Sequence, residues 1–183
     1  MSVLEIVIVI ALLLGLVLIL AYNRLVQARN RVDNAWSQIT VQLERRHDLV
    51  PNLVQTVKGY AVHERQTFEA VAEARVRAMG AQGPPAKAES ENLLSDSLKS
   101  LLAVAESYPA LRASEEFLNL QQQLSDTESR IAFARQFYND AVFAYNTATQ
   151  VLPRRIVATM FGFTPRPFFD VQTTDRAAVP VEF

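Results

Sequence analysis

The sequence predicts an all-α protein, an up-and-down bundle of about four long antiparallel helices that continues from one N-terminal transmembrane helix. Three observations lead to this class. A long uncharged apolar run lies at the start of the chain, apolar residues then recur at helical spacing, and only 5 Gly and 8 Pro occur in 183 residues. The chain has no cysteine, which excludes disulfides, thiolate catalysis and zinc–sulfur sites. Its 18 basic and 19 acidic residues nearly balance, so composition gives no reason to expect a nucleic-acid partner.

The apolar run covers residues 6–22 and contains no charged side chain. With Val3 and Leu4 it reaches the roughly 20 residues that a helix needs to cross a bilayer. A cleaved signal peptide is the alternative, but no Lys or Arg precedes the run and no small-residue cleavage site follows it. We therefore expect a single-pass, uncleaved anchor at residues 1–23. The span would include Ile6, Leu12, Gly15, Leu20 and Tyr22.

Charges next to the span predict its orientation. Arg24, Arg29 and Arg31 follow the run, whereas only Glu5 and the amino terminus precede it. Positively charged flanks usually remain in the cytoplasm. The expected location is thus a cell membrane, with the N-terminus outside and the bundle domain in the cytoplasm.

Helical spacing continues after the span, and prolines and glycines mark the expected breaks. Arg45 and Arg46 lie mostly off the apolar face, Pro51 marks a joint, and the sequence from Ala81 to Ser90 predicts a loop. Pro109 interrupts the third helix, and Ser114 is a capping residue for the fourth. The four helices are expected at about residues 3–47, 51–79, 91–106 and 115–152.

The fourth helix has the most regular pattern, with apolar residues three and four apart over five heptads, as at the a and d positions of a coiled coil. This seam consists of Phe117, Leu120, Leu124, Thr127, Ile131, Ala134, Tyr138, Ala141, Tyr145, Ala148 and Leu152. Such a seam requires helical partners along its length.

We expect residues 24–163 to form the bundle and residues 164–183 to be extended or disordered. The aromatic residues Phe168, Phe169 and Phe183 would either fold back on the domain or dock on a partner.

Residues 154–163 form a short basic and aromatic stretch. Arg154, Arg155, Phe161 and Phe163 are candidates for contact with the membrane surface. The alternative is that these aromatics close the open end of the bundle core.

Asparagine is a poor helix residue unless its amide has a partner, and here it recurs next to tyrosine. The polar residues concerned are Asn23, Asn30, Asn34, Tyr138, Asn139, Tyr145 and Asn146. We expect them to set the register between the first and fourth helices, because one buried Asn can fix register in a coiled seam. A polar binding groove is the alternative.

No catalytic, metal-binding or cofactor-binding residues are predicted. His63 begins the string HERQT, but Thr67 stands where a zinc protease needs its second histidine. His63 and Glu64 are therefore expected on a solvated face, and His47 is expected in a turn, where it could bond a free helix-end carbonyl. A di-iron bundle needs two Glu-x-x-His pairs, which the two histidines do not supply, and Glu91 lies where acids have a structural role at a helix start.

Three strings together resemble the LemA family of bacterial membrane proteins. They are YNRLVQARNRVDNAWSQITVQLERRHDLVPNLVQTVKGYAVHE (22–64), LLAVAESYPALRASEEFLNLQQQLSDTESRIAFARQFYNDAVFAYN (101–146) and FGF (161–163). The resemblance implies a short extracytoplasmic N-terminus, one membrane helix and a helical-bundle domain, and it supplies no catalytic activity. It also implies two contexts, because some members are associated with a membrane metalloprotease of the HtpX type and relatives occur in magnetosome biogenesis.

These features favour a non-catalytic, membrane-tethered scaffold or adaptor. It would self-associate into a homo-oligomer or bind a membrane protein partner, for example a membrane protease system. A second hypothesis is a membrane-shaping or lipid-surface-binding protein. A third is a hydrolase with a dispersed site around His63.

Overall fold

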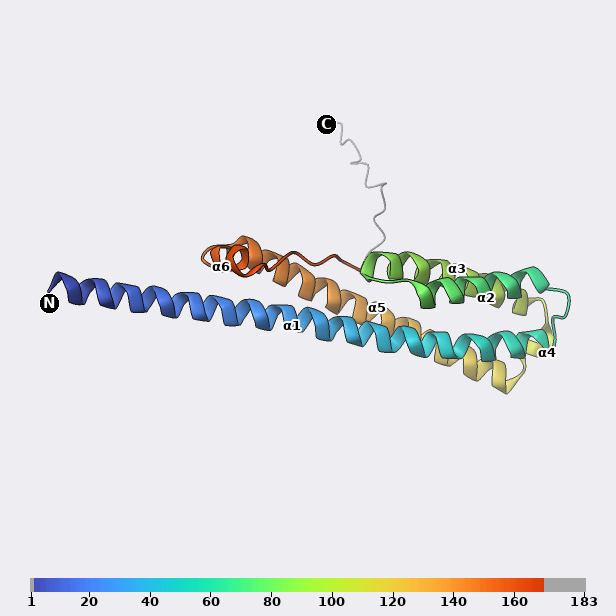
Figure 1. Ribbon diagram of the computed structural model, residues 1–183. Coiled ribbons are helices and arrows are strands. Elements are labelled where there is room, and N and C mark those ends of the chain that lie inside the picture. Colours follow the sequence, from blue (N-terminus) through green and yellow to red (C-terminus); the bar gives the residue numbers. More distant parts are fainter. Residues whose placement is uncertain (1, 170–183) are drawn as a thin grey trace, which may run out of the picture. The chain divides into compact units, whose positions relative to one another are not determined.

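The computed structural model describes residues 2–169, and within this range the regular structure is helical throughout (Figure 1). The all-α prediction is therefore confirmed. The helices are α1 (Val3–Lys58), α2 (Arg65–Gly80), α3 (Pro84–Glu106), α4 (Pro109–Arg112), α5 (Glu115–Gln150) and α6 (Arg154–Phe161).

The chain divides into two compact units. Unit 1 contains residues 2–43 and Ser129–Pro167, and unit 2 contains Glu44–Glu128 together with Phe168 and Phe169. Both α1 and α5 contribute one part to each unit. Each unit has buried apolar residues of its own.

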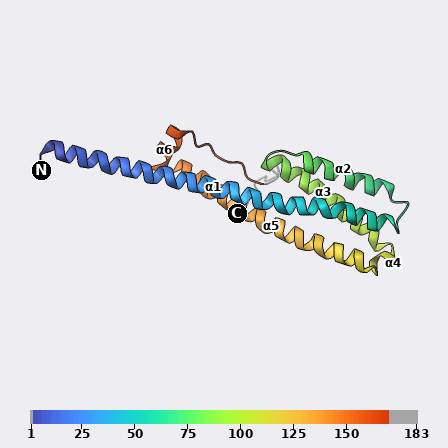
Figure 2. The same cartoon turned by 60° about the horizontal axis from the view of Figure 1, so that its bottom comes forward.

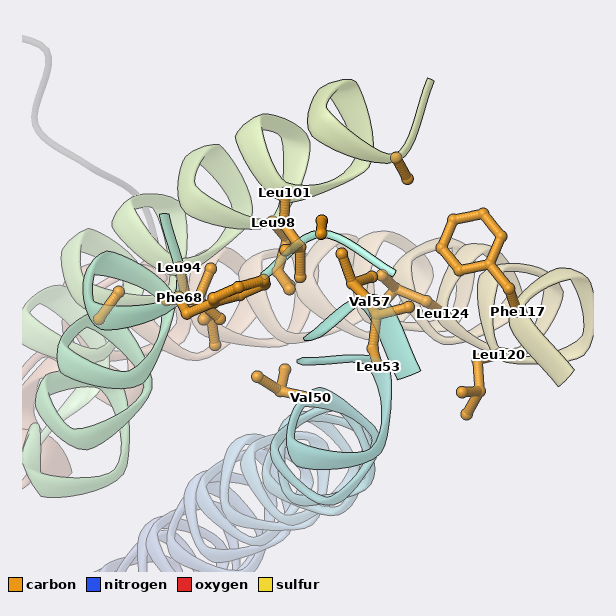
Figure 3. Close-up of a cluster of buried hydrophobic side chains, with 14 of the residues drawn as sticks. Val50, Leu53, Val57, Phe68, Leu94, Leu98, Leu101, Phe117, Leu120 and Leu124 are labelled. Atoms are coloured by element: carbon orange, nitrogen blue, oxygen red, sulfur yellow. The ribbon is translucent and has the colours of Figure 1, made fainter. Parts of the chain in front are cut away.

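Unit 2 is an up-and-down bundle, the arrangement that the sequence predicts for residues 24–163. The last part of α1 and α3 run in one direction, and α2 and the first part of α5 run in the other (Figure 1). Each helix contributes buried apolar residues three or four positions apart, so each presents one apolar face to a shared core (Figure 3). The largest members are Val50, Leu53, Val57, Phe68, Val71, Leu94, Leu98, Leu101, Leu111, Phe117, Leu120 and Leu124.

The predicted joint at Pro51 is wrong, because α1 continues through this proline to Lys58. Proline has no N–H, so the carbonyl of His47, four residues earlier, loses its helical donor. Arg75 of α2 compensates, since its Nε donates to the His47 carbonyl at 2.8 Å. The chain reverses instead at residues 59–64, where the Ala61 N–H still donates to the Val57 carbonyl.

The predicted loop from Ala81 to Ser90 is also largely wrong. Only residues 81–83 separate α2 from α3. Gly83 has a φ of 76°, which favours glycine, and Pro84 then occupies the first turn of α3, where its fixed φ suits a helix and its missing N–H costs nothing. The two prolines therefore begin the helix rather than extend the loop.

The start of α5 agrees with the prediction. The Phe117 N–H donates to Ser114 Oγ at 3.5 Å, and Glu115 and Glu116 lie in the first turn, where the helix dipole favours acids. The predicted seam is buried or half-buried from Phe117 to Ala148. Leu152 is the exception, with 71% exposure, because α5 ends at Gln150.

Unit 1 is built on the first part of α1 and the second part of α5. Leu25, Val32 and Ile39 of α1 are buried, as are Val142 and Tyr145 of α5. The rings of Trp36 and Tyr138 pack across the two helices with their centroids 5.5 Å apart. Together the two helices support α6 and the residues that follow it.

Exchange of Arg75 for methionine tests the compensation of Pro51. We expect Arg75→Met to lower the free energy of unfolding by about 1–2 kcal/mol, because the His47 carbonyl loses its donor. In a Pro51→Ala background the helix supplies its own N–H, so the same substitution should cost little. The double-mutant cycle is measured by unfolding of the full chain in mild detergent, followed by far-UV circular dichroism. Arg77→Met, on the same helix but in an exposed pair with Glu73, is the matched control.

Equal costs for Arg75→Met in the wild-type and Pro51→Ala backgrounds would contradict this account of the continuous helix.

Candidate functional site

The first part of α1 is the one described helix that is long and apolar enough to cross a membrane, and none of that segment is buried inside the protein. Its large apolar side chains from Val3 to Leu20 are 41–80% exposed. Ile6, Leu12 and Leu20 are among them, Gly15 is half-buried, and Tyr22 is 38% exposed. An apolar surface of this kind matches the predicted span.

Burial on α1 begins at Ala21 and Leu25, and this is where α6 packs. Figure 2 shows α6 beside α1 and the end of α5. A small apolar cluster joins these two residues to Ala148 of α5 and to Val157 and Ala158 of α6. Alanine predominates in the cluster, and its small side chain lets helices approach closely. The end of the exposed apolar segment is therefore also the place where three helices of unit 1 meet.

The FGF segment closes this helix contact. Gly162 ends α6 with a φ of 70°, and the Phe163 N–H returns to the Ala158 carbonyl at 2.9 Å. The reversal places two aromatic rings against Tyr22, with centroid distances of 4.9 Å for Phe161 and 5.8 Å for Phe163. The Arg29 guanidinium lies 5.5 Å from the centre of the Phe163 ring, within cation–π range.

Two alternatives were open for residues 154–163, contact with the membrane surface and closure of the bundle core, and each agrees with part of the structure. Phe163 is half-buried and packs against the cluster, as a residue that closes a core would. Phe161 remains 61% exposed, Arg155 is exposed, and Arg154 is half-buried. Contact of these residues with lipid stays a prediction.

Residues 164–167, here called the C-terminal strap, lie against α5 without forming a helix. Tyr145 donates its hydroxyl to the Thr164 carbonyl at 3.0 Å, and Tyr138 donates to the Pro167 carbonyl at 2.8 Å. Burial raises the pKa of both tyrosines, so both hydroxyls are protonated donors at neutral pH.

Asn146 and Arg166 complete this attachment. The Asn146 amide accepts the Arg166 N–H at 2.8 Å and donates to the Arg166 carbonyl at 2.9 Å, like a neighbouring strand. The Arg166 guanidinium reaches Asp33 of α1 at 3.2 Å. Pro165 and Pro167 favour an extended backbone, which leaves the strap's carbonyls open to these side chains.

The polar residues selected from the sequence thus separate into two groups. Tyr138, Tyr145 and Asn146 bind the strap, a partner that the sequence analysis did not consider. The α1 residues Asn23, Asn30 and Asn34 are exposed, and Asn139 is half-buried. A role of this set in helix register stays a prediction.

The tail aromatics at positions 168 and 169 differ in exposure. Phe169 is only 2% exposed and Phe168 is 42% exposed, so Phe169 folds back on its own chain. Phe183 lies outside the described residues.

Unit 2 contains a buried charge cluster, formed by Arg46, His47, Glu91, Ser95 and Glu128. Arg46 is 1% exposed, although the helical pattern placed it off the apolar face. It pairs with the Glu91 carboxylate, with Glu128 Oε1 at 2.5 Å and with Ser95 Oγ at 2.8 Å. Its Nε is buried without a hydrogen-bond partner.

The second carboxylate oxygen of Glu91 contacts His47. The His47 Nε2 lies 2.9 Å from Glu91 Oε1, and Glu91 is 3% exposed. The expectation that His47 lies in a turn is therefore wrong, because α1 is unbroken there. Burial would raise the pKa of Glu91, but the hydrogen bond from His47 and the charge of Arg46 outweigh it, and the pKa lies below its ordinary value.

The histidines and acids of the described residues do not converge on a reactive centre. Residues 2–169 contain no cluster of three His, Asp or Glu suited to a metal ion. His63 is exposed in the connection between α1 and α2, while His47 and Glu91 are bonded to each other inside the core. The buried carboxylate of Glu91 is therefore occupied by Arg46 and His47.

Sequence analysis missed an exposed aromatic pair on α5. Phe133 and Phe137 are 74% and 52% exposed, and with Val41 of α1 they line a shallow groove of about 500 Å³ in unit 1. The amide oxygen of Gln42, which also lines this groove, is buried without a hydrogen-bond partner. The detectable signal was two phenylalanines four residues apart and outside the heptad seam.

Comparison with known proteins gives one family and three relatives. Residues 35–183 match the sequence profile of the LemA family. The chain is 26% identical to magnetosome proteins MamQ 1 and MamQ 2 of Paramagnetospirillum magneticum and 25% identical to magnetosome protein MamQ of Magnetospirillum gryphiswaldense. Each alignment covers 83% of this chain and 65% of the relative, so the chain spans about 65% of the length of these relatives.

Removal of the Glu91 charge should destabilise the protein. We expect Glu91→Gln to lower the free energy of unfolding at neutral pH by about 3 kcal/mol, because the buried Arg46 loses a counter-ion. Glu73→Gln, which alters an exposed pair, is the control. Replacement of both partners, Arg46→Met with Glu91→Leu, should cost much less than the sum of the single changes.

The pH dependence of this effect has a defined sign. The folded pKa of Glu91 lies below the ordinary value of 4.5, so its stabilising contribution is complete above about pH 4.5 and is lost as pH falls through the folded pKa. The difference in unfolding free energy between wild type and Glu91→Gln should therefore shrink in acid. A difference that grows as pH falls would refute the assignment.

Gly162→Ala tests the reversal at the end of α6. No atom lies within 4 Å of an added Cβ, so the cost should be conformational, at about 1 kcal/mol for a left-handed residue. Gly80→Ala is the matched control, since Gly80 ends α2 without a positive φ and alanine there should be neutral or stabilising. Both are measured as changes in unfolding free energy in detergent, and equal effects would exclude a special role for Gly162.

Proposed function

This chain belongs to the LemA family, and we propose that it is a non-catalytic, membrane-tethered scaffold that self-associates through the aromatic groove of unit 1. The observation that carries the proposal is the exposure of Phe133 and Phe137 on a helix whose opposite face is buried. Large apolar side chains grouped on a water-facing surface are typical of sites that bind another protein.

The groove has the composition of a protein interface. Phe133, Phe137 and Val41 supply apolar area, and Arg130 and Gln38 lie at its edge. Aromatic residues, phenylalanine among them, and arginine are enriched at protein interfaces relative to the rest of the surface.

The membrane anchor favours a second copy as the occupant. Anchored copies of one chain share the same orientation and the same depth in the bilayer. The groove of one copy therefore faces that of another at the same height when the two are related by a two-fold axis along the membrane normal. Confinement to a membrane also raises the effective concentration of copies, so a modest contact is sufficient.

Catalysis forms no part of the proposal. The histidines of the described residues are either exposed or bonded within the charge cluster, and the family match adds no reactive residue. The relatives are named magnetosome proteins, which supports a role in organising a specialised cellular structure. An adaptor for a different membrane protein, such as a membrane protease, is the competing form of the same function.

The orientation is proposed as the N-terminus outside and the bundle in the cytoplasm. Arg24, Arg29 and Arg31 follow the span in sequence, and α6 adds Arg154 and Arg155 in the unit that contains the span. Arginines concentrated at one end of a span support a cytoplasmic location for that end.

The mass of the full-length protein in mild detergent tests self-association. Light scattering with the detergent contribution subtracted should give at least twice the 20.5 kDa of one chain. Phe133→Ser with Phe137→Ser should return the mass to one chain. Phe143→Ser is the matched control, because Phe143 is 65% exposed on the same helix but does not line the groove, and this variant should remain associated.

Three results separate the possible outcomes. A wild-type oligomer that persists in the double variant places the interface elsewhere. A monomer whose Phe137 position crosslinks to another membrane protein in intact cells replaces the second copy with that partner. A monomer that gives no crosslink from either phenylalanine position contradicts the scaffold proposal.

A further inference from the structure

We propose that α6 is a second membrane contact, which docks on the surface of an acidic bilayer beside the end of the span. The inference rests on the membrane anchoring in the proposed function, and it does not depend on self-association. It assigns to α6 a lipid partner with anionic headgroups.

The apolar surface of α6 continues that of the span. Leu18, Ile19 and Tyr22 of α1 and Met160 and Phe161 of α6 line one hollow of about 260 Å³. The span side chains in this hollow are the ones that the bilayer would cover. A lipid chain that covers Leu18 and Ile19 also reaches Met160 and Phe161, because all four border the same space.

The two faces of α6 differ as an interfacial helix requires. Val157 and Ala158 are buried against α1 and α5. On the outward side, Ile156, Met160 and Phe161 are 51%, 67% and 61% exposed. Three large apolar side chains directed away from the protein on one eight-residue helix are costly in water and favourable at the headgroup–acyl boundary.

The charge of this region matches an acidic surface. Residues 6–32 and 141–169 contain no Asp or Glu. The same two segments contain Arg24, Arg29, Arg31, Arg154, Arg155 and Arg166. Among these, Arg166 pairs with Asp33 and Arg29 lies over Phe163, whereas Arg155 is exposed on α6 itself. Uncompensated arginines next to an exposed apolar face are the combination that anionic headgroups attract.

Tyr22 and Phe161 indicate the depth of this contact. Their rings meet edge to face at 4.9 Å, and both remain partly exposed. Aromatic residues concentrate at the boundary between hydrocarbon and headgroups. The boundary therefore lies near Tyr22, and α6 lies within the headgroup layer.

Single-cysteine labelling of the full chain tests this assignment, because the natural sequence has no cysteine. Met160→Cys reports on α6, and Leu12→Cys reports on the span. Met79→Cys is the matched control, an exposed methionine on α2 in unit 2. Each variant carries an environment-sensitive fluorophore and is reconstituted into vesicles of phosphatidylcholine and phosphatidylglycerol at a ratio of about 7:3, a mixture that carries anionic headgroups. One set of vesicles also contains lipid brominated near the headgroup end of the acyl chain, which probes position 160, and a second set contains lipid brominated near the methyl end, which probes position 12 about 15 Å deeper.

We expect the label at 160 to be quenched several-fold more strongly than the label at 79. Arg154→Gln with Arg155→Gln should reduce quenching at 160 several-fold, and so should vesicles of pure phosphatidylcholine. Quenching at 12 that persists while 160 matches 79 overturns the proposal for α6 and leaves the anchor intact. Absence of quenching at both 12 and 160 overturns the anchor as well. Strong quenching at 160 that is indifferent to the arginines and to lipid charge overturns the assignment of an acidic partner.

Discussion

The packing of unit 1 depends on the point along α1, between Leu20 and Ala21, where its side chains change from exposed to buried. From Val3 to Leu20 the helix shows apolar side chains on all sides, and from Ala21 onward it buries one face against other helices. Its backbone does not change at this level, because an α-helix satisfies its own hydrogen bonds in lipid and in water alike. Only the surroundings of its side chains change, from the expected lipid to the other helices of unit 1. The contacts of α6, the FGF reversal and the end of α5 all concentrate there.

Small residues make this concentration possible. Ala21, Ala148 and Ala158 bring three helices together, and Gly162 lets the chain turn back at once. The aromatic rings then fill the space around Tyr22. The C-terminal strap continues from this point and is held by hydrogen bonds rather than by apolar packing. Its prolines keep the backbone extended, and side chains of α5 donate hydrogen bonds to its carbonyls. Local backbone preference and distant side-chain donors thus act together to place the C-terminal residues of unit 1.

Elements whose partners lie nearby in sequence were predictable, and those whose partners lie far away were not. The heptad pattern from Phe117 to Ala148 identified buried positions because each turn of a helix reports its own face. Pro51 was misread because the rule for proline is local, whereas the donor to His47 is Arg75 on another helix. Tyr145 and Asn146 stood out as polar residues in need of partners, but nothing local indicates that the partner is residues 164–167. Phe133 and Phe137 were not predicted because one pair at helical spacing is a weak signal beside a seam of five heptads.

The charge cluster has a consequence for how the bundle of unit 2 can vary. A core of leucine, valine and alanine accepts many relative positions of its helices, because one apolar contact can replace another. Arg46, Glu91 and Glu128 come from α1, α3 and α5, and a slide of one helix by one turn, about 5.4 Å, would separate their charges inside an apolar interior. We infer that these three residues fix the register of the helices, which the surrounding apolar residues leave free. Apolar positions of this bundle can then change one at a time, whereas the buried Arg46 and Glu91 can be replaced only together.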